Sequence, residues 1–353
     1  MIKLFKRSIK RKTKEERVER ALKSILSLEE KEPTPKIETR VACVQRQIKP
    51  VKKVDEFIYE MYLFTKEAAS NGAQYIVFPE YNFFDLFGLL PGFRKLNNSL
   101  NKRASDQRKQ KDSSEEGSSN NFLYDLFYLF ARPSERVLLT TMKELAQHFN
   151  MYIYTGTYIY LEKDHLYNRG TLIDPEGKII AHQDKVHLTD FEAEIGLQRK
   201  NYFEVVSLPI GNVAIPVCMD ASYFETFQVI TASKAEIVML PIANNESYNK
   251  WRAMRGIWGR VQESYVYGLK ASLNGSIGGL EFTGKAGIFA PINMTENEDG
   301  IVALAENPIG DELIIADLDL ELLMEARNNA PYFGDRNEDF EREFYENTYV
   351  KGE

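Results

Sequence analysis

The feature that most constrains the fold is an alternation of strand, helix and strand over residues 40–80. Residues 40–45 and 75–80 are short apolar runs, which are typical of buried strands. Residues 54–70 between them repeat apolar side chains at helical spacing, at Phe57, Ile58, Met61, Phe64 and Ala68. This order indicates a crossover unit with parallel strands, and ligands of such sheets bind beyond the carboxyl ends of the strands. The sequence therefore predicts an α/β protein with Glu80 at one of these ends.

The same alternation continues to about residue 330 and indicates one α/β domain over residues 39–330. The chain has 353 residues, of which 43% are apolar and 12% aromatic, and this is enough for a substantial core. A basic N-terminal extension and linker over 1–38 and an acidic, aromatic tail over 331–353 are expected outside this domain. Further helices are expected over 136–149, 248–265 and 321–327.

Two segments differ in composition from the rest of the chain. Residues 1–36 are crowded with Lys and Arg and then place four apolar side chains at helical spacing, Val18, Leu22, Ile25 and Leu26. This pattern favours a basic amphipathic helix in weak contact with a membrane or a protein, or a solvated extension, followed by a linker at Pro33. Residues 97–121 are rich in Ser, Asn and charge and indicate a mobile polar insertion. We expect both segments to be dispensable for folding.

Charge and cysteine content exclude several classes of protein. The net charge of −7 leaves no excess of Lys and Arg to neutralise phosphates, which argues against a nucleic-acid partner. The two cysteines, Cys43 and Cys218, cannot form a disulfide framework or a cysteine metal site. No apolar run approaches membrane-spanning length. We expect a cytoplasmic protein in a reducing compartment, with no metal and no cofactor.

Cys218 closes an apolar run over 213–217 and precedes a segment with helical periodicity. A cysteine at a helix N-terminus is stabilised as the thiolate, the nucleophilic form. Free cysteine is also among the most buried residue types, so inert packing is the alternative for Cys218 and the stronger expectation for Cys43.

Two further residues suit a reaction at Cys218. Glu80 interrupts apolar sequence at a strand end, where burial would raise its pKa and make it a usable base. Lys185 is a cation in an expected strand, although taken alone a solvent-facing lysine is the more common case. The structural interpretation of each residue taken alone does not explain why all three occur together. As a set, they are Glu80, Lys185 and Cys218.

At these residues the chain resembles the nitrilase superfamily of carbon–nitrogen hydrolases. The resemblance covers residues 39–328 and rests on three motifs in the right order, Phe78-Pro79-Glu80, Asp184-Lys185-Val186-His187-Leu188 and Pro216-Val217-Cys218-Met219-Asp220. It implies a four-layer α-β-β-α sandwich that pairs through helices into a homodimer.

The resemblance also implies a mechanism. Glu80 would take the proton from Cys218 and later from water, and Cys218 would attack an amide or nitrile carbon to form a thioester or thioimidate. Lys185 and the backbone N–H of Met219 would stabilise the oxyanion. A second glutamate near the lysine would help to position the substrate, with Glu192 the first choice and Glu194 the reserve.

Departures from the family pattern bear on the substrate. Ser222 and Phe224 stand where members commonly have an arginine and a proline, which puts carboxylate-bearing substrates in doubt because that arginine can hold a carboxylate. Asp220 is similar to the amidase branches and favours a small linear amide over a nitrile. Expected pocket residues are Tyr81, Asn244 and Asn245, and the two asparagines could instead be ordinary turn formers.

Three other interpretations remain at this point. A Cys–His hydrolase would use His187 as the base, and an acyltransferase would pass the same thioester to an amine or alcohol. A non-catalytic binding protein that kept the fold is disfavoured by the intact Glu80, Lys185 and Cys218.

Overall fold

The computed structural model describes residues 2–27, 35–110, 119–330, 337 and 339–343. Its strands form one large mixed sheet with the central order β5-β4-β3-β2-β1-β10-β9-β8-β7. The strands are β1 (Arg40–Gln47), β2 (Tyr75–Val77), β3 (Tyr152–Glu162), β4 (His165–Ile173), β5 (Ile179–Asp184), β6 (Leu197–Gln198), β7 (Val205–Leu208), β8 (Gly211–Ala214), β9 (Ile237–Ile242), β10 (Tyr267–Ile277), β11 (Leu280–Phe282), β12 (Gly287–Phe289), β13 (Ile301–Leu304) and β14 (Glu312–Asp317).

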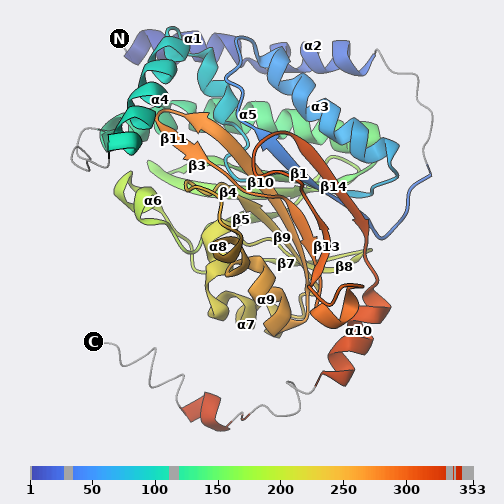
Figure 1. The fold of residues 1–353 in the computed structure, drawn as a ribbon. Coiled ribbons are helices and arrows are strands. Elements are labelled where there is room, and N and C mark those ends of the chain that lie inside the picture. Colours follow the sequence, from blue (N-terminus) through green and yellow to red (C-terminus); the bar gives the residue numbers. More distant parts are fainter. Residues whose placement is uncertain (1, 28–34, 111–118, 331–336, 338, 344–353) are drawn as a thin grey trace.

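Helices cover the strands from two sides (Figure 1). On one side lie α1 (Ile2–Lys12), α2 (Glu15–Leu26), α3 (Val54–Ser70), α4 (Phe93–Gln110) and α5 (Ser119–Phe149). On the other lie α7 (Phe224–Ala232), α8 (Lys250–Met254), α9 (Ile257–Ser264) and α10 (Leu320–Asn329). The connections carry the short helix α6 (Asp190–Glu194) and the 3-10 turns η1 (Phe84–Leu89), η2 (Cys218–Ser222) and η3 (Ile292–Met294).

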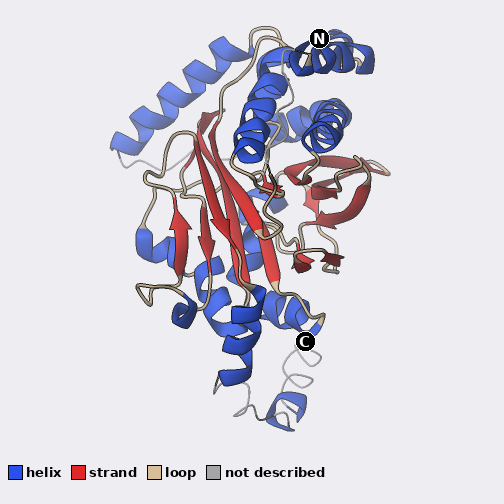
Figure 2. Ribbon diagram, turned by 90° about the vertical axis from the view of Figure 1, so that its right-hand side faces the viewer, coloured by secondary structure: helices blue, strands red, loops and turns tan. Residues whose placement is uncertain are grey.

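The sheet folds back on itself where β1 pairs with β10, so its two halves face each other. Buried side chains from both halves, such as Val41 of β1 and Ile237 of β9, pack in one shared cluster. A second cluster joins α3 and α5 to the first half, and a third joins α7 and α9 to β9. Figure 2 shows the strands of both halves between the outer helices. The predicted α/β fold with a four-layer α-β-β-α arrangement is therefore confirmed.

The crossover unit predicted over residues 40–80 is present. Strands β1 and β2 pair in parallel, with Val41 opposite Tyr75, and α3 has the predicted bounds. The turn that follows the helix contains Gly72, whose φ is +75° and whose missing Cβ would lie 2.9 Å from the carbonyl oxygen of Pro35. Only glycine fits this helix end without strain. The chain then leaves β2 so that Glu80 follows its carboxyl end.

Some element boundaries differ from the sequence prediction. The helix expected over 136–149 is the end of the longer α5, and the helix expected over 248–265 is broken into α8 and α9. The break lies at Gly256, whose ψ of −129° is not helical. Lys185, expected inside a strand, comes directly after the last residue of β5.

The N-terminal segment packs on the core, which corrects the expectation that residues 1–36 bury too little apolar area to matter for folding. Ile9, Val18 and Leu22 are fully or almost fully buried in the same cluster as α3 and α5. The apolar stripe of α2 therefore faces this protein's own helices. The linker expected at Pro33 lies outside the described residues, as does most of the expected tail over 331–353.

Shortening a side chain on this stripe should destabilise the protein. Leu22→Ala should lower the free energy of unfolding by about 2–5 kcal/mol, since Leu22 is 2% exposed and its loss leaves a cavity. Lys23→Ala, on the exposed side of the same helix, should change it by less than about 0.5 kcal/mol. Urea unfolding followed by circular dichroism measures both. Equal midpoints for the two variants would mean that α2 is not part of the core.

The segment expected to be a polar insertion is only partly so. Residues 97–110 belong to α4, and 111–118 lie outside the described residues. The helix is anchored because Asn97 accepts a hydrogen bond from the backbone N–H of Gly278 at 2.6 Å and Asn101 accepts one from Gly279 at 2.7 Å. In the described part of the chain, no helix combines the length and apolarity needed to cross a membrane.

Candidate active site

The candidate site is a pocket of about 390 Å³ beyond the ends of β2, β5 and β9 and beside the turn η2. All eight residues selected from the sequence contribute to its lining, although they come from four separate stretches of chain. They are Glu80, Tyr81, Lys185, Glu192, Cys218, Met219, Asn244 and Asn245.

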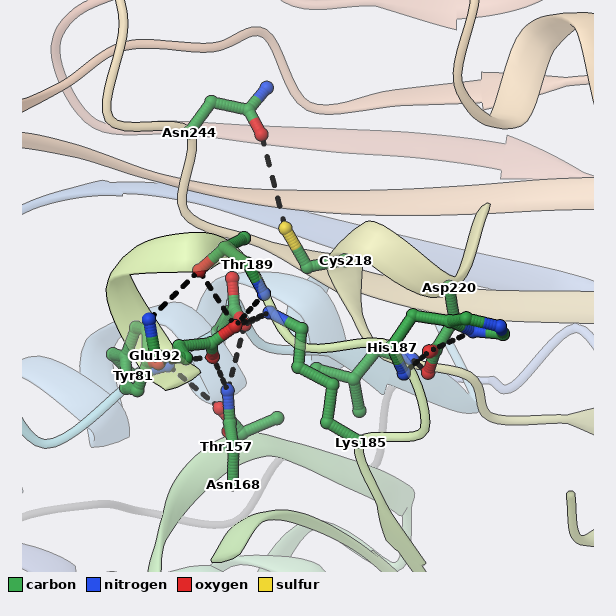
Figure 3. A network of polar contacts seen from close by, with 12 residues as sticks. Tyr81, Thr157, Asn168, Lys185, His187, Thr189, Glu192, Cys218, Asp220 and Asn244 are labelled. Atoms are coloured by element: carbon green, nitrogen blue, oxygen red, sulfur yellow. Dashed lines mark hydrogen bonds and ion pairs between the residues drawn. The ribbon is translucent and has the colours of Figure 1, made fainter. Parts of the chain in front are cut away.

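Cys218 is the first residue of the turn η2, which comes after β8 in the chain. Its φ of +44° is in the left-handed region, which costs a non-glycine residue about 1–2 kcal/mol. Such strain persists only where the surroundings impose it, and it occurs often at active sites. Figure 3 shows the side chain of Cys218 pointing toward Asn244, whose Oδ1 lies 3.9 Å from Sγ.

The carboxylate of Asp220 imposes this backbone and joins it to the lysine segment. It is fully buried and accepts hydrogen bonds from the backbone N–H of Val217 at 2.9 Å and of His187 at 2.7 Å. One acid therefore holds the residues before Cys218 and those after Lys185 in a fixed relation. Sequence reasoning treated Asp220 only as a marker of substrate type.

Lys185 lies between two carboxylates. Its Nζ is 2.8 Å from Oε1 of Glu80 and 2.7 Å from Oε2 of Glu192, and its side chain is 1% exposed. Burial alone would lower the pKa of Lys185, but Glu192 and Glu80 raise it well above its ordinary value. The ammonium group is therefore permanently charged and can act as an electrostatic group but not as a base.

The two carboxylates have different proton affinities. Burial raises the pKa of Glu80, and the neighbouring charge of Glu192 adds to this effect while Lys185 opposes it. Burial also acts on Glu192, but Lys185, Tyr81 and the backbone of Thr189 outweigh it and lower its pKa. Two acids whose pKa values are pushed apart can divide the roles of proton carrier and fixed charge. Glu80 is suited to the first role and Glu192 to the second.

Three residues that hold these acids were missed or underrated in the sequence. Asn168 of β4 donates to Oε1 of Glu80 at 2.8 Å and to Oε1 of Glu192 at 2.9 Å, so one amide spans both. The hydroxyl of Tyr81 donates to Glu192, as does Thr189 from its backbone at 2.9 Å. Thr189 and Glu192 have the spacing of a capping box, which is visible in the sequence. The amide side chain of Asn168, which lies within a strand, was a second visible sign of a polar site.

The expected thiolate at a helix N-terminus is not what the structure shows. Burial raises the pKa of the Cys218 thiol well above its ordinary value, and the nearby charge of Glu80 raises it further. The turn η2 has five residues and supplies little dipole to oppose this. Cys218 is therefore a thiol at rest and needs a base to become a nucleophile.

The remaining candidates fall in different places. Glu192 lies in the short helix α6, and Glu194 is exposed in the same helix. Asn245 accepts a hydrogen bond from the backbone N–H of Glu281 at 3.2 Å, which ties the segment after β9 to β11. His187 does not line the pocket, because its Nδ1 lies 3.0 Å from Oδ1 of Asp220 (Figure 3). Its ring stacks on that of Tyr223.

No group of three or more His, Cys, Asp or Glu side chains among the described residues is arranged to hold a metal ion. The part of the pocket around Cys218 combines its thiol with the two acids Glu80 and Glu192 and the ammonium group of Lys185. Together they can perform proton transfer, nucleophilic attack and anion stabilisation.

Comparisons with known proteins agree with this chemistry. The family model described as Carbon-nitrogen hydrolase matches residues 40–328. The chain is similar to the probable hydrolase YhcX of Bacillus subtilis, with 24% identity over 82% of this chain and 52% of that protein. It is also similar to the omega-amidase NIT2 of Bos taurus, with 24% identity over 56% of this chain and 72% of that protein. The chain thus spans about half the length of the first of these relatives.

Among solved structures, the chain is similar to a double mutant of the amidase from Nesterenkonia sp. AN1 in complex with acrylamide. The TM-score is 0.61 and the identity 16%, over 88% of this chain and 99% of that chain. At this identity the likeness shows the fold alone.

Proposed function

This chain belongs to the carbon–nitrogen hydrolase family, and on that premise we propose that it hydrolyses the amide bond of a small molecule through a thioester at Cys218. The observation that carries the proposal is the position of Lys185 between Glu80 and Glu192 in the pocket that Cys218 lines.

In the first half of the reaction, Glu80 takes the proton of the Cys218 thiol as Sγ attacks the amide carbon. The tetrahedral intermediate then carries its negative charge on oxygen, where the Nζ of Lys185 and the backbone N–H of Met219 stabilise it. Glu80 returns the proton to the departing nitrogen, the carbon–nitrogen bond breaks, and ammonia or an amine leaves. The acyl group stays on Cys218 as a thioester.

In the second half, Glu80 takes a proton from water and the resulting hydroxide attacks the thioester carbon. The carbon–sulfur bond breaks, the thiolate recovers the proton from Glu80, and a carboxylic acid is released. Glu192 stays ionised throughout, because Lys185, Tyr81 and Thr189 all stabilise its charge. Its charge also keeps the pKa of Glu80 raised, so that Glu80 can both accept and return a proton.

An amide substrate is favoured over a nitrile by two observations. Asp220 follows Cys218 by two residues, which is the pattern of the amidase branches. The relatives that the chain is similar to include an omega-amidase and a deaminated glutathione amidase.

The test is a panel of short aliphatic amides and the nitriles of the same carbon chains. We expect amides to give ammonia and carboxylic acid in equal amounts, and to be turned over faster than their nitriles. Adding hydroxylamine during turnover should give a hydroxamate, because it competes with water for the thioester. A folded protein that releases no ammonia from any amide, and forms no hydroxamate, would contradict the proposal.

A further inference from the structure

Lys270 of β10 is a buried cation that the mechanism does not use. It is 7% exposed and lines the pocket with Cys218, together with a small adjoining recess that also contains Asn244 and Thr283. Its Nζ lies 5.2 Å from the centre of the Phe289 ring. It has no hydrogen bond or ion pair with any residue that the structure describes.

An unpaired ammonium group in this position is unfavourable. Lysine is almost never fully buried unless it is paired, because removing its charge from water costs several kcal/mol. Burial lowers the pKa of Lys270 to about 8, and repulsion from Lys285 acts in the same direction. At pH 7 the group is still mostly protonated. The pocket therefore holds a positive charge that has no counter-ion among the residues that the structure describes.

The other charges of the pocket are balanced or lie at its rim. Lys185 is neutralised by Glu80 and Glu192, as described above. Arg252 pairs with Glu246 at 2.8 Å, and both side chains are partly exposed. Asp190 and Arg255 line the pocket at exposed positions. Among the described lining residues, Lys270 is the buried cation that an incoming ligand would have to satisfy.

We propose that Lys270 binds a carboxylate of the substrate, and that the substrate is a short amide carrying a carboxylate at the end opposite the scissile bond. This inference rests on the proposed function. The sequence put such substrates in doubt, because Ser222 stands where family members commonly have an arginine that can hold a carboxylate. In the structure, Lys270 of β10 supplies a cation from a different strand. A carboxylate is favoured over a phosphate, since one ammonium and one amide, that of Asn244, suit a single charge better than a dianion.

Matched pairs of substrates and variants test the inference. Succinamate and glutaramate carry one carboxylate, and the diamides succinamide and glutaramide are their neutral isosteres. For the wild-type protein, kcat/KM for the faster of the two carboxylate substrates should exceed kcat/KM for the corresponding diamide by at least about tenfold. Lys270→Met should lower kcat/KM for the carboxylate substrate by about tenfold to a hundredfold, mainly by raising KM. It should change kcat/KM for the diamide only a few-fold.

Lys250→Met is the matched control, because Lys250 is an exposed lysine of α8 that lines neither the pocket nor the adjoining recess. It should leave the preference for the acid unchanged. Lys270→Met should fold, since methionine replaces an unpaired buried charge with an apolar group of similar length.

The outcomes separate this inference from the proposed function. If amides are hydrolysed but the acids are not preferred, or if Lys270→Met leaves their preference intact, Lys270 does not bind the substrate. If no amide is hydrolysed at all, the proposed function itself fails.

Discussion

Replacing Cys218 with alanine should abolish amide hydrolysis and the formation of any covalent intermediate. Among the described residues that line the pocket, Cys218 is the only thiol, and a thioester can form only on a thiol. Loss of a nucleophile of this kind lowers kcat by on the order of a millionfold. Ammonia release measures the rate, and intact-protein mass spectrometry after mixing with substrate measures the acyl adduct.

Cys43→Ala is the matched control. Cys43 is fully buried in β1, and burial raises the pKa of its thiol well above the ordinary value. The Cys43→Ala protein should lose little or no activity and should still form the acyl adduct. Limiting iodoacetamide at neutral pH should label Cys218 first, since its side chain reaches the pocket. Preferential labelling of Cys43, or an acyl adduct that survives Cys218→Ala, would refute the assignment.

Replacing Lys185 with alanine should have the second largest effect. Loss of one oxyanion donor lowers the rate of the chemical step by about a hundredfold to a thousandfold. Because this interaction develops in the transition state, turnover should fall far more than substrate affinity. His187→Ala should lose much less, since His187 contacts Asp220 and Tyr223 outside the pocket. Single-turnover acylation with an activated ester measures both variants.

The pH dependence of acylation distinguishes catalysis by Lys185 from a purely structural role. Glu80 acts as a base in its ionised form, which is present above its pKa, so the rate falls as the pH drops through that value. Lys185 lowers the pKa of Glu80, and removing it should therefore move this acidic limb to higher pH. A folded Lys185→Ala protein that acylates at the parent rate with an unmoved acidic limb would contradict the mechanism. A loss of activity with His187→Ala greater than with Lys185→Ala would support a Cys–His enzyme.

Sequence alone determined the features that depend on local pattern. The bounds of α3, the crossover unit that ends at Glu80 and the likeness of three motifs to one family were all read from residues close together in the chain. These features are accessible because apolar periodicity and turn residues act over a few residues. The same locality explains the error at α2, where the basic composition suggested solvent although the apolar stripe of Val18 and Leu22 packs on distant helices.

Only the tertiary structure decided how the charges of the site are shared. The pKa values of Glu80, Glu192 and Cys218 depend on burial and on partners that lie far away in the sequence, such as Lys185 beside Glu80. Asn168 and Asp220 are ordinary residues in the sequence and become positioning groups only because distant strands bring their partners to them. Whether a lysine is paired or lacks a counter-ion is likewise a property of its three-dimensional surroundings. Lys185 and Lys270 are the same residue type in the sequence. In the folded chain Lys185 lies between two carboxylates, whereas Lys270 has no ion-pair partner among the described residues.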